Sequence, residues 1–291
     1  MPSWQGKSKG NKLGYSCFVF LLKHGGVAPA YLLLRFVAFY YFVFSWSSSK
    51  PIYSYLRKKA GYGSWRALIN LYRNYYIFGQ TLIDKIVVMA GLANKFSFEF
   101  EGEHYLREMV AGGKGGILLS AHLGNWEVAG HLFTRLQARI NIVMFDGEHQ
   151  RIKDYLSDVT GGRNMNIIVI RDDLSHIYAI NEALNNKELV CMHADRFLPG
   201  NKTISASFLG QEARFPVGPF LLAATFRVPV SMVFAFKESS THYHFYASEP
   251  HQYHGRRNQG VENALNDFVA QITEKVRRYP VQWFNYYDFW E

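Results

Sequence analysis

The pattern of hydrophobic and polar positions changes character partway along the chain. Residues 63–92 (GSWRALINLYRNYYIFGQTLIDKIVVMAGL) place apolar side chains near the helical period of 3.6 and contain no proline, which predicts a long helix. Beyond residue 115, short apolar runs typical of strands take over. They are GILLS (116–120), INIVMF (140–145), NIIVI (166–170) and ELVCM (188–192).

Helix-like stretches separate these runs, at roughly 125–138, 149–159 and 174–186. Strands that alternate with helices predict βαβ units and a mainly parallel sheet. Near the C-terminus, residues 228–236 and 242–248 resemble a strand pair, and residues 260–278 predict a closing amphipathic helix. We therefore expect an α/β fold with a mainly parallel sheet flanked by helices. Its domain would cover residues 93–291, after a helical N-terminal region over residues 1–92.

An apolar, aromatic run at residues 27–46 dominates a segment, 15–46, that we expect to associate with a membrane. The run is long enough to span a bilayer. However, Arg35 sits near its middle, at a cost of about 2.5–3.5 kcal/mol on insertion scales. We expect a helix that lies in or dips into a membrane. The alternative is a buried core helix whose arginine points outward to solvent.

Composition and charge narrow the choice of partner. Hydrophobic residues make up 48% of the chain, and the aromatic share of 16% nearly equals the charged share of 19%. The formal net charge of +9 indicates an anionic partner, such as nucleic acid, phospholipid headgroups, an acidic carrier protein or a phosphorylated substrate. Cys17 and Cys191 fit neither a zinc site nor a disulfide framework, which favours a reducing compartment.

Ionisable residues follow four successive predicted strands. His122, Asp146, Arg171 and Asp195 each stand within three residues of a strand end. Ligands of open parallel sheets gather beyond the carboxyl ends of the strands. We therefore expect the functional site at this edge of the sheet.

The spacing of His122 and Glu127 suggests how such a site would work. On one continuous helix the two side chains would point about 140° apart, so His122 is expected in a loop and Glu127 in the first helical turn. Asn125 is a suitable N-cap for that helix. Glu127 would then orient one imidazole nitrogen and leave the other for proton transfer. The alternative is that both residues merely cap a helix.

No protein nucleophile accompanies this pair. The chain lacks the G-x-S-x-G elbow, so the acceptor substrate would itself be the nucleophile, deprotonated by His122.

The interpretation of two further features of the sequence stays open. The pair His242 and His244 on one strand face could bind metal, although no third ligand stands at a fitting spacing. The aromatic residues of 283–290 fit either a membrane-interface belt or a last core strand.

Sequence blocks in a fixed order then point to a known family. HLGNWE has the H-x4-D/E pattern of glycerolipid-type acyltransferases, and SAHLGNWEVAGHL resembles the lipid A biosynthesis (late, or secondary) acyltransferases of the lysophospholipid acyltransferase superfamily. VIRDDLSHIYAINEALNNKELVCMHADR and SFLGQEARFPVGPFLLAATFRVPV are similar to later blocks of that family. The resemblance covers residues 15–285 and implies the fold of the glycerolipid acyltransferases.

The resemblance also implies roles for individual residues. His122 would be the general base and Glu127 its orienting partner, with no metal and no cofactor besides the acyl donor. The residues implied in substrate binding are Asn125, Arg171, Asp195, Arg196 and Gly218. Arg171 would bind phosphate or phosphopantetheine, which suits a guanidinium. Asp195 would organise the pocket. Two departures concern Asp146, where many members carry a basic residue, and the acidic and aromatic C-terminus.

The implied function is transfer of a fatty acyl chain from an acyl carrier protein or CoA thioester to a hydroxyl of a lipid A-type glycolipid precursor. The enzyme would act on the cytoplasmic face of the inner membrane, with the lipid acceptor and the membrane surface as partners and no nucleic acid. An amino-acid lipid or a lysophospholipid is the alternative acceptor. Two other classes stay open: a metal-dependent hydrolase using His122, Glu127 and the HYH pair, and a basic non-enzymatic membrane- or nucleic-acid-binding protein.

Overall fold

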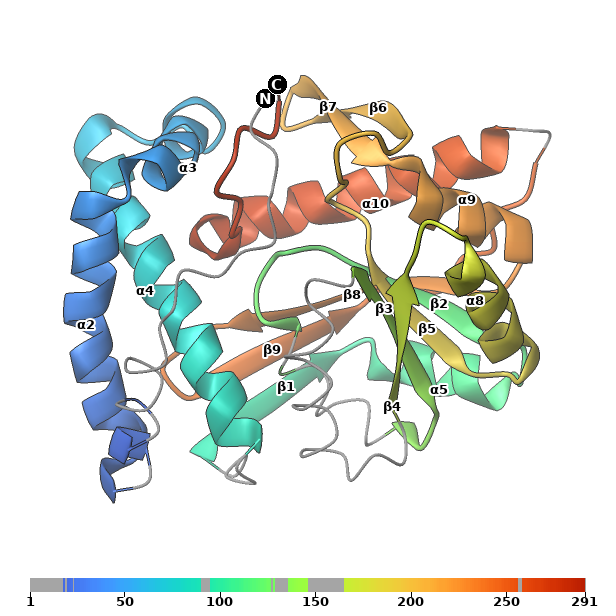
Figure 1. The fold of residues 1–291 in the computed structure, drawn as a ribbon, viewed down its shortest axis with the longest axis horizontal. Helices are drawn as coiled ribbons and strands as arrows, with labels where there is room; N and C mark the ends of the chain where they lie inside the picture. Colours follow the sequence, from blue (N-terminus) through green and yellow to red (C-terminus); the bar gives the residue numbers. More distant parts are fainter. Residues whose placement is uncertain are drawn as a thin grey trace.

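The computed structural model describes residues 18, 20–22, 24–89, 95–126, 128, 136–145, 165–255 and 258–290. Within these residues, helices lie on either side of a central sheet (Figure 1). In chain order the strands of that sheet are β1 (Ser97–Glu101), β2 (Gly116–Ser120), β3 (Ile140–Phe145), β4 (Met165–Ile170), β5 (Leu189–His193), β8 (Val230–Lys237) and β9 (His242–Ala247).

The described strands form a seven-stranded, mostly parallel sheet in the order β1-β9-β8-β2-β5-β3-β4. Only the β8–β9 pair runs antiparallel among these neighbours. All five residues of β2 are buried, because neighbouring strands and the covering helices enclose it on every side. Leu118, at its middle, pairs with Cys191 of β5 and Ser231 of β8. The α/β fold class with a mainly parallel sheet is confirmed.

The individual predicted strands agree with the observed ones to within about two residues. The four apolar runs between residues 116 and 192 correspond to β2 to β5. The runs at 228–236 and 242–248 correspond to the antiparallel pair β8 and β9. The predicted helices at 174–186 and 260–278 correspond to α8 (Ser175–Asn185) and α10 (Gln259–Arg278). The predicted helix at 149–159 lies outside the described residues.

Several elements have no counterpart among the predictions. These are β1, α5 (Glu103–Ala111) and the separate antiparallel hairpin of β6 (Thr203–Phe208) and β7 (Gln211–Pro216). β1 alternates exposed and partly buried residues over only five positions. β6 and β7 carry many small and polar residues. Their sequences therefore lack the continuous apolar run that reveals a buried strand.

Three long helices lie in the described part of the N-terminal region. They are α2 (Val27–Phe44), α3 (Trp46–Lys58) and α4 (Ser64–Met89), and both α2 and α3 pack against α4 (Figure 1). The predicted long helix at 63–92 is thus confirmed over α4. α4 also packs on the short helix η3 (Pro280–Gln282). The N-terminal helices therefore touch the C-terminal segment directly.

The surface of α2 is unusual for a helix of a folded domain. Among the described helices, α2 alone is long and apolar enough to cross a membrane, yet only 22% of it is buried. Its buried residues are Ala30, Tyr31, Leu34 and Ala38. The opposite side exposes Phe36, Phe39 and Phe44, and Arg35 is exposed as well. A buried core helix, the alternative weighed above, does not fit this surface.

Candidate functional site

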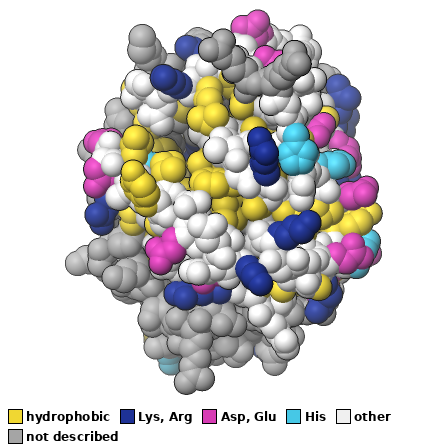
Figure 2. All heavy atoms as spheres, turned by 90° about the vertical axis from the view of Figure 1, so that its right-hand side faces the viewer, with side chains coloured by type: hydrophobic (Ala, Val, Ile, Leu, Met, Phe, Trp, Pro, Cys, Tyr) yellow, Lys and Arg dark blue, Asp and Glu magenta, His cyan; other side chains and the backbone are white. Residues whose placement is uncertain are grey.

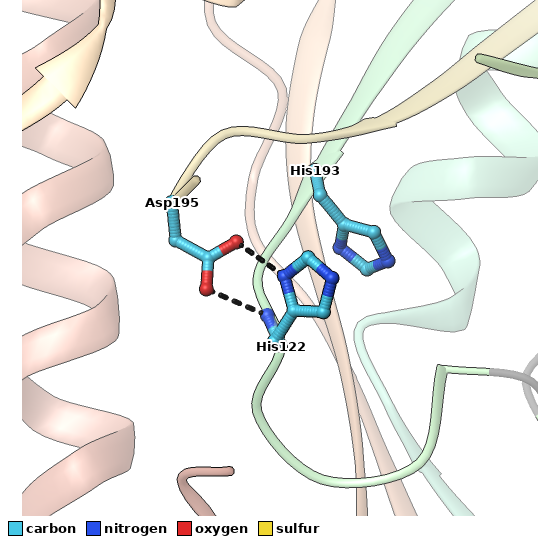
Figure 3. Close-up of side chains that lie close together, drawn as sticks. All are labelled: His122, His193 and Asp195. Carbon is cyan, nitrogen blue, oxygen red and sulfur yellow. Dashed lines mark hydrogen bonds and ion pairs between the residues drawn. The ribbon is translucent and has the colours of Figure 1, made fainter. Parts of the chain in front are cut away.

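His122 and Asp195 meet at the carboxyl edge of the sheet. His122 lies two residues beyond β2 and Asp195 two residues beyond β5, the parallel neighbour of β2. The Asp195 carboxylate accepts two hydrogen bonds from His122, one from the backbone N–H and one from the ring Nδ1, each 2.9 Å long (Figure 3). The two contacts fix both the position and the orientation of the imidazole.

The protonation of this pair follows from its surroundings. Asp195 is 2% exposed, and burial alone would raise the pKa of its carboxyl. The charge and hydrogen bonds of His122, together with Arg196, outweigh burial and hold that pKa well below its usual range. An ionised carboxylate only accepts hydrogen bonds, so Nδ1 of His122 must carry a proton. In the neutral ring Nε2 is then the basic nitrogen, as a general base requires.

His193 is a third member of the site that the sequence analysis did not assign. Its ring lies against His122, with 4.4 Å between ring centroids, and edge-on to Trp126 at 5.1 Å (Figure 3 shows the two imidazoles). Burial, reinforced by His122, lowers the pKa of His193 to about 3, so the ring is neutral. No hydrogen-bond partner within the described part of the chain meets its buried Nδ1. In the sequence, only its position beside Asp195 could have pointed to it.

One group of metal-ligating side chains lies close together in the described residues. The ligand atoms of His122, His193 and Asp195 are all within 4.8 Å of one another. The short, two-point contact between His122 and Asp195 accounts for this geometry without an ion. The predicted absence of a metal stays a prediction.

The loop after β2 explains the glycine and the asparagine of HLGN. Gly124 has a φ of +73°, and a Cβ there would lie 2.0 Å from the carbonyl oxygen of Ala235 on β8. Only glycine tolerates both conditions. Asn125 donates its backbone N–H to the same carbonyl at 2.7 Å, and its Oδ1 accepts from the N–H of Val128 at 3.4 Å. This is the N-cap contact predicted for Asn125, and Trp126 and Val128 are helical.

The C-terminal segment around residues 282–284 forms hydrogen bonds with the loop that carries His122. The carbonyl of Gln282 accepts the Gly124 N–H at 2.8 Å, and the Phe284 N–H donates to the carbonyl of His122 at 3.2 Å. Arg196 donates from Nη2 to the carbonyl of Phe284 at 2.7 Å. Since Arg196 follows Asp195 directly, a closed set of contacts links the base, its carboxylate and the C-terminal segment. Arg196 therefore makes a structural contact here, and its predicted role in substrate binding stays a prediction.

The C-terminal aromatic residues belong to the core. Trp283, Phe284 and Phe289 are buried, and Trp283 packs on Tyr55 of α3 and Phe208 of β6. Their backbone forms only an isolated bridge, between Trp283 and Leu123, and no regular strand. Neither a membrane belt nor a full core strand, the two options left open above, describes these buried residues.

The other predicted site residues are placed differently. Arg171 follows β4 at the same edge of the sheet, but three strand spacings of about 4.8 Å, roughly 14 Å, separate β4 from β2. Gly218 lies in the first turn of α9 (Val217–Phe226), and a Cβ there would meet nothing within 4 Å. Glu127 and Asp146 lie outside the described residues, and their roles stay predictions. The contact predicted for Glu127, orientation of an imidazole nitrogen, is made on Nδ1 by Asp195.

The HYH pair lies away from this group. His242 and His244 stand on β9, which β8 separates from β2. His244 faces three carboxylates, from Glu99, Glu101 and Glu238, at 3.4–3.9 Å. The pair therefore does not join His122 in a common metal site within the described residues.

Comparison with known proteins places this arrangement in a family. Residues 73–290 match the family described as bacterial lipid A biosynthesis acyltransferase. Two curated relatives, both named phosphatidylinositol mannoside acyltransferase and from two strains of Mycobacterium tuberculosis, are 28% identical over 146 residues. This alignment covers 45% of the chain and 42% of each relative, so it spans less than half of their length. The family match covers most of the chain and includes His122, Asp195 and the C-terminal segment, and the chain therefore belongs to the bacterial lipid A biosynthesis acyltransferase family.

Proposed function

We propose that the protein is a membrane-bound acyltransferase that moves a fatty acyl chain from a thioester to a hydroxyl of a lipid A-type glycolipid precursor. The observation that carries this proposal is the two-point contact of Asp195 with His122, which leaves Nε2 as the basic nitrogen. A carboxylate that orients a histidine is half of the arrangement that hydrolytic triads use. Here the acceptor hydroxyl takes the place of the protein nucleophile.

The proposed reaction has two stages. Nε2 of His122 takes the proton of the acceptor hydroxyl while its oxygen attacks the thioester carbonyl. The tetrahedral intermediate then collapses, the C–S bond breaks, and the thiolate leaves with the proton held by His122. The helix predicted to follow Asn125 would present the positive end of its dipole near this edge, which suits the oxyanion. The N–H groups of Gly124 and Asn125 already bind carbonyls, so donors elsewhere must complete the oxyanion site.

An acyl carrier protein fits as the donor, with CoA as the alternative. The net charge of +9 favours an acidic partner. One face of the molecule gathers hydrophobic side chains, with Lys, Arg, His, Asp and Glu side chains around them (Figure 2). The helices α8 and α9 lie on this side of Figure 1 and expose Tyr178 and Leu221. Arg171, at the carboxyl end of β4 beside α8, would bind the phosphate of the phosphopantetheine arm.

The acceptor is proposed from the family, with one alternative. A glucosamine-based lipid A precursor is the family's namesake substrate. The curated relatives are named for a mannosylated phosphatidylinositol, so a phospholipid-linked sugar is the second candidate. An amino-acid lipid or lysophospholipid stays a further option. The exposed apolar side of α2 would rest on the cytoplasmic face of the inner membrane and bring the site to such lipids.

The test is mass spectrometry of total lipids and of the lipid A fraction. A host that lacks the gene would be complemented with wild type, with His122→Ala, or with His104→Ala as a matched control at an exposed histidine. We expect one lipid class to gain a single acyl chain with wild type and with the control only. Restoration of the same lipid by His122→Ala would contradict the proposed base. No acylated lipid in any arm would contradict the function.

A metal-dependent hydrolase is tested with the purified protein. The proposed mechanism uses no ion, so chelation with EDTA should leave thioester turnover unchanged. Stoichiometric zinc in the active protein, with loss of activity on its removal, would favour the group His122, His193 and Asp195 as a metal site instead.

A further inference from the structure

A buried polar cluster joins the N-terminal helices to the sheet. The carboxylate of Asp84, on α4, is fully buried and binds Lys237 of β8 at 2.6 Å. The hydroxyl groups of Tyr31, from α2, and Tyr243, from β9, both donate to the same carboxylate. Lys237 also donates to Tyr31 at 3.0 Å and to the carbonyl of Ser240 at 2.8 Å. The proposed transfer reaction does not use any of these residues directly.

One member of this cluster reaches the loop that carries the base. The Tyr243 hydroxyl accepts a hydrogen bond from Nδ2 of Asn125 at 3.0 Å. Burial holds the pKa of Tyr243 well above its usual value, so the hydroxyl keeps its proton and donates it to Asp84. Apart from Tyr243, Nδ2 has only a longer contact, 3.4 Å, with the carbonyl of Thr81. Tyr243 is therefore the nearer anchor of the Asn125 amide.

The orientation of that amide matters for the site. With Nδ2 held by Tyr243, Oδ1 faces the N–H of Val128 and caps the helix that begins at Trp126. Asn125 stands three residues after His122, and its backbone N–H is bound to β8. A rotation of the amide would break the N-cap hydrogen bond with Val128. It would also loosen the loop that joins His122 to Asn125.

We propose that Tyr243 is a positioning residue for acyl transfer, which acts by orienting Asn125 and, through the loop, His122. The expected loss of kcat rests on the proposed function. The expected loosening of the loop rests on the geometry alone. Loss of the hydroxyl should lower kcat about 10- to 100-fold, because displacements of about 1 Å at a site cost rates of this order. KM for the thioester should change little.

Tyr31 provides a matched control. Its hydroxyl donates to the same buried carboxylate, so Tyr31→Phe and Tyr243→Phe each remove one donor from Asp84. Tyr31 binds Asp84, Lys237 and Ser240, and it has no bond to Asn125 among the contacts of the described residues. Both variants should therefore lower Tm, whereas only Tyr243→Phe should lower kcat.

Two measurements would test the inference on the purified full-length chain. The first is kcat and KM for thiol release from palmitoyl thioesters of CoA or acyl carrier protein, with extracted host lipids as acceptor. The second is hydrogen exchange of the peptide covering residues 118–126, which requires no activity. We expect faster exchange and lower kcat in Tyr243→Phe, and wild-type values for both in Tyr31→Phe. Equal kcat and exchange in the two variants would overturn the proposal.

A second variant keeps the test decisive if Tyr243→Phe folds poorly. Asn125→Ser retains an N-cap oxygen but removes the amide donor to Tyr243. It should show a loss of kcat like that of Tyr243→Phe, and the double variant should lose no more than either alone. Independent, multiplicative losses would overturn the proposal. An inactive wild type would instead count against the proposed function, while the exchange data would still judge the role of Tyr243.

Discussion

At the scale of single residues, Asp195 has the most consequential position in the molecule. It holds the backbone and the ring of His122 at once, from a site closed to solvent. In the proposed mechanism its carboxylate would also balance the positive charge that His122 acquires after proton abstraction. Asp195 would then contribute twice, to the geometry of the base and to its charge.

Replacement of Asp195 by asparagine tests this double role. The amide NH2 would donate toward Nδ1 and favour the wrong tautomer, with the proton on Nε2. We expect kcat to fall by about 10²- to 10⁴-fold with little change in KM, as in other oriented histidine bases. Asp267→Asn, which alters a carboxylate bound to Tyr253, is the control and should keep full activity. Steady-state kinetics of both variants would check it, and an active Asp195→Asn would contradict the assignment of tautomer.

The lowered pKa of His193 predicts how the stability of the protein depends on pH. Its folded pKa of about 3 lies below the ordinary 6.5, so the unfolded chain binds the extra proton between these values. Stability should therefore fall as the pH drops below 6.5, by up to about 1.4 kcal/mol per pH unit. The depressed pKa of Asp195 acts only below about pH 4.

The measurement is urea unfolding between pH 7 and 4.5. His193→Gln should flatten the slope, whereas the exposed His104→Gln should retain the wild-type slope. If wild type and His193→Gln show the same slope, the histidine is not held neutral by burial.

At the scale of elements, the loop between β2 and the following helix depends on how closely it approaches β8. Gly124→Ala and Gly210→Ala both place a side chain at positive φ, which costs about 1–2 kcal/mol each. Only at Gly124 would the new Cβ meet a backbone oxygen, since nothing lies within 4 Å at Gly210. We expect a modest Tm loss in Gly210→Ala, and in Gly124→Ala a larger Tm loss together with at least a 100-fold loss of kcat. Comparable kcat values in the two variants would argue against a tightly held loop.

The elements also show what a sequence does and does not reveal. The apolar runs of β2 to β5 could be recognised because central parallel strands are buried on both faces. The edge at which His122, Arg171 and Asp195 lie followed from that topology. The contact between Asp195 and His122 could not be foreseen, because many residues separate them. The local sequence does not reveal which strands are neighbours in the sheet. The hydrogen bond from the Phe284 N–H to the carbonyl of His122 could not be foreseen either, because almost any residue could supply this backbone group.

At the scale of the whole molecule, the exposed apolar side of α2 would set how the protein meets a membrane in the proposed function. Phe39 and Phe44 are 58% and 71% exposed, on a helix whose other side packs on α4. The hydrogen bond from Tyr31 to the buried Asp84 attaches α2 to the protein body. Such a helix is suited to lie along the lipid interface.

Vesicle sedimentation tests this orientation. Phe39→Ser with Phe44→Ser should weaken binding to vesicles of phosphatidylethanolamine and phosphatidylglycerol by at least 10-fold, because each aromatic side chain contributes about 1.5–3 kcal/mol when buried. Leu174→Ser with Tyr178→Ser, equally exposed residues at α8, is the matched control and should bind as wild type. Equal weakening by both pairs would place the membrane contact elsewhere.

The pairing of Gly124 and His122 with Gln282 and Phe284 has a consequence for biosynthesis. More than half of the chain separates the two segments, so the ribosome releases the loop long before its last backbone partners exist. A nascent chain that already carries α2 and most of the sheet would therefore still hold an unfinished site. The proposed acyl transfer would then begin only after the segment near residue 284 has emerged, when the polypeptide has had the opportunity to reach the membrane proposed for it.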